Sequence, residues 1–85
     1  MSYSYLSNMT QVKLDKSLAE DLITSKMRLL QQYINEILNR WNETSSKEFL
    51  EKARKGVHEN AEEDAIELRQ ILADYTKLQE ILNQL

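Results

Sequence analysis

Residues 17–42 carry apolar side chains at alternating intervals of four and three, the spacing of a heptad repeat. The residues that keep this spacing are Ile23, Met27, Leu30, Ile34, Ile37 and Trp41. Because a helix completes a turn every ~3.6 residues, the spacing places all of them along one side of a long helix. Ser17 followed by Glu20 fits a capping box and predicts the start of this helix, while Asp15 is an alternative cap two residues earlier.

Residues 61–84 repeat the pattern and predict a second long helix. Its evenly spaced apolar residues are Leu68, Ile71, Tyr75, Leu78, Leu82 and Leu85. Asn60, with Glu63 three residues later, fits the cap of this helix, and the acids Glu62, Glu63 and Asp64 favour the positive end of its dipole. Two helices of similar length, each with one apolar side, pack most simply as an antiparallel helical hairpin.

A short segment between the two long helices carries its own start and stop signals. Residues 42–46 are mostly turn-forming, and Ser45 with Glu48 fits a second capping box. Gly56 suits the left-handed residue that ends a helix. The sequence therefore predicts an all-α domain, residues 17–85, in which a short connecting helix joins the two long ones. The apolar residues on one side of the short helix are Phe49, Leu50 and Ala53.

Each long helix has more apolar surface than one neighbouring helix would cover. The additional apolar residues are Leu18, Leu22, Leu29 and Tyr33 on the first helix and Ala65, Leu72 and Ile81 on the second. An exposed strip of this kind normally marks an interface, and a second copy related by a two-fold axis would cover it. We therefore expect a homodimer in which two hairpins form a four-helix bundle. The predicted interface residues are Leu18, Leu22, Leu29, Tyr33, Trp41, Leu72, Tyr75 and Ile81, with burial in the core as the competing interpretation for the aromatic ones.

Residues that could carry chemistry are few and match no catalytic or metal-binding pattern. The only histidine, His58, is followed by Glu59, but Glu62 stands where the zinc-protease motif HExxH requires its second histidine. We expect His58 to be a solvated turn histidine and the acids of residues 59–67 to stabilise the start of the second long helix. With no Cys and one Gly, the sequence predicts no catalytic residue, no cofactor and no metal site, and hence a protein that is not an enzyme.

The first residues follow a different pattern, and residues 1–16 are expected to form an N-terminal arm that is extended or partly disordered. Apolar and polar residues alternate near the end of this arm before the helical pattern begins. Residues 10–22 resemble the opening of ribbon-helix-helix proteins, a family that includes many bacterial antitoxins. The resemblance implies a strand that pairs with its copy and turns Gln11 and Lys13 toward DNA. A small DNA-binding regulator or antitoxin is therefore the alternative function, although the heptad pattern here continues where that family interrupts its first helix.

Charge and hydropathy narrow the expected function further. The net charge is −3, and no stripe of basic residues of the kind that binds phosphate is present, so general nucleic-acid binding is not expected. The longest apolar run, residues 71–73, is too short for a signal peptide or a transmembrane helix, and we expect a cytoplasmic protein. The function expected from the sequence is a small helical protein–protein interaction or adaptor protein that acts as a homo-oligomer.

Overall fold

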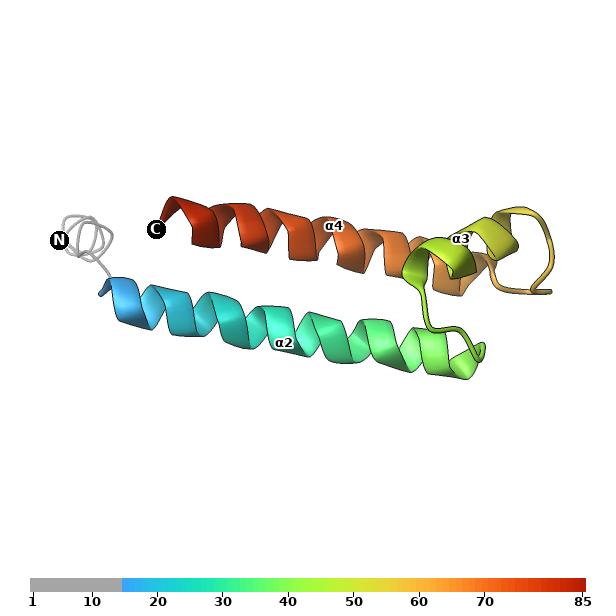
Figure 1. Ribbon diagram of the computed structural model, residues 1–85, viewed down its shortest axis with the longest axis horizontal. Coiled ribbons are helices and arrows are strands. Elements are labelled where there is room, and N and C mark those ends of the chain that lie inside the picture. The colour runs from blue at the N-terminus through green and yellow to red at the C-terminus, as the bar shows by residue number, and fades with distance from the viewer. Residues whose placement is uncertain (1–14) are drawn as a thin grey trace, which may run out of the picture.

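The protein folds as an antiparallel helical hairpin with a short third helix near one end (Figure 1). The computed structural model describes residues 15–85, in which α2 spans Lys16–Arg40, α3 spans Ser46–Arg54 and α4 spans Glu62–Gln84. Helices α2 and α4 lie side by side, and α3 packs mainly against α4. The end that holds α3 is called the turn end below, and the opposite end is called the free end. The predicted all-α hairpin with a short connecting helix is confirmed.

The start of α2 is set by the earlier of the two candidate caps. The side chain of Asp15 accepts a hydrogen bond from the backbone N–H of Ser17, at 2.8 Å, and α2 begins at the residue between them. The prediction of Ser17 as the cap is therefore wrong. A carboxylate accepts such a bond strongly and is also stabilised by the positive end of the helix dipole, which explains why Asp15 caps α2. Of the predicted N-terminal arm, residues 1–14 lie outside the described residues.

The other helix boundaries follow the sequence signals with one exception. The hydroxyl of Ser45 accepts the backbone N–H of Glu48 at 3.2 Å, and Gly56 has a φ of 79° just after α3, as predicted. The exception is Asn60, which adopts a left-handed conformation with φ 60° and does not cap α4. The capping residue is Ala61, which makes no side-chain cap bond. Asn tolerates left-handed backbone better than most residues, so position 60 serves the turn instead.

The two heptad seams meet between α2 and α4 and form most of the core. The side chain of Phe49 extends this core into α3 and is fully buried. Ala65, expected in the uncovered row, is only 3% exposed, so that prediction is wrong; α3 packs along this side of α4, where Ala53 and Ala65 line the same hollow. The buried apolar residues are Met27, Leu30, Ile34, Ile37 and Leu38 of α2, Phe49 of α3, and Ala61, Ala65, Leu68 and Ile71.

Candidate interaction surface

The α2–α4 pair has two faces, and α3 covers part of one of them. Thr24 and Gln31, which directly follow seam residues of α2, line a shallow hollow together with Gln79, which follows a seam residue of α4. Helix α3 packs on the same face, because Arg69, which also follows a seam residue, lines a hollow with Ala53 of α3. In Figure 1 this face, called the α3 face below, is turned toward the viewer.

The opposite face, called the open face, is formed by residues that directly precede seam residues. Antiparallel helices are related by a two-fold axis perpendicular to their common plane, so equivalent positions of α2 and α4 lie on the same face. Leu22, Leu29 and Tyr33 precede seam residues of α2, and Ile81 precedes Leu82 of α4. These side chains therefore share the open face, on the side of the hairpin away from α3.

Five large exposed apolar side chains form what we call the apolar row: the four just placed on the open face, and Leu18, which lies one helical turn before Leu22 on the same side of α2. Each of them was predicted to lie in an interface. They extend from residue 18 to residue 33 of α2 and include one residue near the end of α4, whereas the part of this face nearest the turn end presents polar residues such as Glu36, Arg40 and Glu63. Exposed apolar side chains that gather on one side of a protein are typical of interaction sites. The exposed fractions are 48% for Leu18, 57% for Leu22, 37% for Leu29, 42% for Tyr33 and 39% for Ile81.

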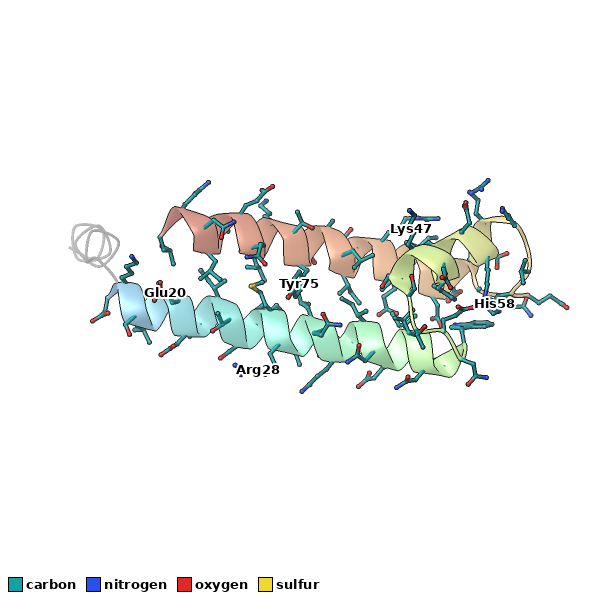
Figure 2. All side chains as sticks on the ribbon, in the orientation of Figure 1. Glu20, Arg28, Lys47, His58 and Tyr75 are labelled. Atoms are coloured by element: carbon teal, nitrogen blue, oxygen red, sulfur yellow. The ribbon has the colours of Figure 1, made fainter. Side chains whose placement is uncertain are left out.

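Three other predicted interface residues are not part of the apolar row. Leu72 directly follows Ile71 and is partly buried on the α3 face. Trp41 and Tyr75 are also partly buried and pack against the core, and Figure 2 shows Tyr75 between α2 and α4. The structure thus brings five of the eight predicted interface residues together. The predicted DNA-facing residues, Gln11 and Lys13, lie outside the described residues.

A buried carboxylate organises the turn end of the hairpin. Glu43 is 8% exposed, and Lys52 of α3 donates a hydrogen bond to its Oε2 at 3.0 Å. His58, labelled in Figure 2, lies with its Nε2 2.6 Å from the same oxygen; since a carboxylate only accepts, Nε2 carries the proton. The hydrogen bond from His58, followed by that from Lys52, holds the pKa of Glu43 below its usual value. The prediction of His58 as a solvated turn histidine is therefore wrong.

A second carboxylate ties the end of α2 to the start of α4. The indole N–H of Trp41 donates to Asp64 at 2.7 Å, and Arg40 donates to the same oxygen at 2.8 Å. The bond from Trp41, with a smaller contribution from Arg40, lowers the pKa of Asp64. The Trp41 ring also lies against the rings of Phe49 and His58, with centroids 6.0 and 5.3 Å away. These contacts fix the geometry of the turn end.

The sequence analysis missed both carboxylate sites at the turn end. Glu43 was treated only as part of a turn, and Asp64 only as an acid near a helix start. One available signal was Trp41, because a partly buried tryptophan usually needs an acceptor for its indole N–H. Nothing equivalent pointed to Glu43, whose partners come from another helix and from the turn after it.

The acidic residues and the histidine of the described part of the chain do not gather into a metal site. Within residues 15–85, no group of three or more His, Asp or Glu side chains converges closely enough to hold a metal ion. Glu43 and Asp64 are occupied by neighbouring donors in structural roles. None of α2, α3 and α4 combines the length and apolar character that crossing a lipid bilayer requires.

No protein-family model, curated protein or solved structure matches this chain. Within residues 15–85, the apolar row holds five of the eight large apolar side chains that are exposed, and the two carboxylate sites hold the turn end in shape.

Replacing Glu43 with Gln is expected to lower the midpoint of thermal unfolding at pH 7 by several degrees, because Lys52 and His58 lose the charge that they face. Folding lowers the pKa of Glu43, so its contribution to stability is present above the unfolded-chain value of 4.5 and is lost as pH falls through the lower folded-state pKa. The difference between variant and wild type should therefore shrink below about pH 4 in melts followed by circular dichroism.

The matched control for this variant is Glu51→Gln. Glu51 pairs with Arg54 within α3, and its side chain is 49% exposed, so the loss of its charge should change stability little. Equal destabilisation by the two variants would contradict the structural role of Glu43. A difference between Glu43→Gln and wild type that stays constant down to pH 2 would contradict the assigned pKa direction.

Proposed function

We propose that this protein is a non-enzymatic helical interaction protein that works as a homodimer through its open face. The single observation that supports the proposal most is the apolar row on that face. Its five side chains come from two helices and lie on one side of the hairpin, where α3 does not reach. Side chains this large are normally buried against a partner when they occur together.

The energetics of burial favour association. Burial of a fully exposed Leu or Ile side chain contributes about 1.5–3 kcal/mol, and the apolar row is between one-third and two-thirds exposed. A dimer buries the row twice, once from each copy. Association costs about 4–15 kcal/mol in lost translational and rotational freedom. The free energy gained by burying the two apolar rows, together with the side chains around them, is of the size needed to offset this cost.

An adaptor role is compatible with this dimer. Pairing through the open face leaves the α3 face and the turn end of each copy exposed, and these surfaces could contact a different protein. The alternative of a DNA-binding regulator depends on Gln11 and Lys13 and therefore remains a prediction from the sequence.

Light scattering after size exclusion is expected to give about twice the chain mass of 10.0 kDa at micromolar concentration. The physical reason is the double burial of the apolar row. The mass should fall toward that of one chain on dilution, since association depends on concentration. A folded wild-type monomer at micromolar concentration would contradict the proposed homodimer. The apolar row would then be a docking site for a different protein.

A further inference from the structure

The part of the apolar row that lies on α2 has a spacing that reads the same in both directions. Leu18, Leu22, Leu29 and Tyr33 are separated by four, seven and four residues. In a two-fold symmetric contact, residue i touches j of the partner whenever j touches i. A symmetric spacing is therefore what an antiparallel pairing of α2 with its own copy requires.

We infer that two copies pack open face to open face, with α2 antiparallel to the partner's α2 and the two-fold axis passing between Ser25 and Lys26. Leu18 then meets the partner's Tyr33, and Leu22 meets the partner's Leu29. This inference rests on the proposed homodimer and adds its orientation and register. Lys26 directly precedes Met27 and therefore lies on the open face close to the axis, where its long side chain must carry the ammonium group to the edge of the contact.

The position of Ile81 supports the same axis independently. The bond between Trp41 and Asp64 sets the register of α2 against α4, and Met27 and Gln79 line one hollow further along the pair. In this register, the point between Ser25 and Lys26 lies across from residues 79 and 80 of α4. Ile81, the member of the apolar row on α4, is thus close to the axis and meets its own copy there.

The polar part of the open face fits this arrangement as well. In the antiparallel packing residues 16–35 of α2 lie against the same residues of the partner, so Glu36, Arg40 and Glu63 remain in solvent. The other way to stack the two open faces as a four-helix bundle places α2 on the partner's α4. It would set Leu29 and Tyr33 against Asp74 and other polar residues that precede the α4 seam, leaving apolar side chains without apolar partners.

The area of the proposed contact is sufficient for a stable dimer. The overlapping part of each hairpin is about 30 Å long at 1.5 Å per residue and two helices wide at about 10 Å each. The footprint is therefore about 600 Å² per copy, or about 1,200 Å² in total, at the lower end of the range for stable interfaces.

Single cysteines test the register, because the chain has no Cys of its own. Lys26→Cys places two thiols beside the axis on the open face, where the Cα atoms of the two copies come close to the ~4.4–6.8 Å that a disulfide spans. Glu36→Cys is the matched control, since Glu36 directly precedes Ile37 on the same face of α2 and its two copies would be ~30 Å apart. Both positions are exposed, so neither change disturbs the core.

Under mild oxidation, Lys26→Cys is expected to run as a cross-linked dimer on a non-reducing gel, and Glu36→Cys as a single chain. Cross-linking of both variants to the same extent would overturn the antiparallel register. Cross-linking of neither, with light scattering still showing dimers, would overturn this inference and leave the proposed homodimer standing. Monomers for wild type and both variants would overturn the proposed function and this inference together.

Discussion

Replacement of Leu30 by Asp is expected to abolish folding, whereas the same replacement at the neighbouring Leu29 should leave a folded monomer. Leu30 is 5% exposed within the α2 seam, and Leu29 is 37% exposed within the apolar row. Removal of a buried leucine side chain alone costs about 2–5 kcal/mol, and an unpaired carboxylate adds the cost of burying a charge. The total approaches the whole stability of a small domain, about 5–15 kcal/mol.

Two measurements separate the two leucine variants. Circular dichroism should show loss of most helical signal for Leu30→Asp and retention of it for Leu29→Asp. Light scattering should then give the mass of one chain for Leu29→Asp, because each dimer would place two carboxylates in its apolar contact. A dimeric Leu29→Asp protein would contradict the interface on the open face. A folded Leu30→Asp protein would contradict the position of the core.

The second large loss of stability is expected from truncation of Phe49, whose side chain is fully buried. Phe49→Ala should destabilise the protein by about 3–5 kcal/mol, because it leaves a cavity between α3 and the long helices. For a chain of this length, that corresponds to a fall of about 10 °C or more in the unfolding midpoint. The fluorescence of Trp41 should also change, since the two rings lie 6.0 Å apart between centroids.

The control for the Phe49 variant is Val57→Ala at the same end of the molecule. Val57 is 63% exposed, and its truncation should change stability by no more than about 0.5 kcal/mol. If Phe49→Ala destabilised the protein no more than Val57→Ala does, burial of Phe49 would not be what holds α3 to the hairpin. Calorimetric melts of both variants at one protein concentration provide the comparison.

The core of the hairpin could be predicted because it depends on a short-range regularity of the chain. Leu30 and Ile34 recur with the period of the helix, and burial follows whenever two such seams meet. The short helix was predicted for a similar local reason, since Ser45 and Glu48 form its cap within a single turn. The apolar row on α2 was visible in the same way, as residues beside the seam that one neighbouring helix would not cover.

The polar contacts at the turn end could not be predicted, because their partners are distant in the chain and have no repeating pattern. His58 reaches Glu43 over 15 residues, and Trp41 reaches Asp64 over 23 residues. Whether such residues meet depends on the path of the chain between them, including the left-handed residues Asn42 and Asn60. Composition and spacing say nothing about that path.

The hydrogen bond between Trp41 and Asp64 also bears on the order in which α2 and α4 pair during folding. It joins residues 23 apart, whereas seam residues nearer the free end join ever longer stretches of chain, at a rising cost in loop-closure entropy. We therefore expect the helices to pair from the turn end outward and the free end to fray first. Leu18, Leu22 and Ile81 of the apolar row lie near that end, so a second copy packed on them would hold together the part of the molecule that one chain holds least firmly. Dilution would then loosen the free end and separate the copies in the same step.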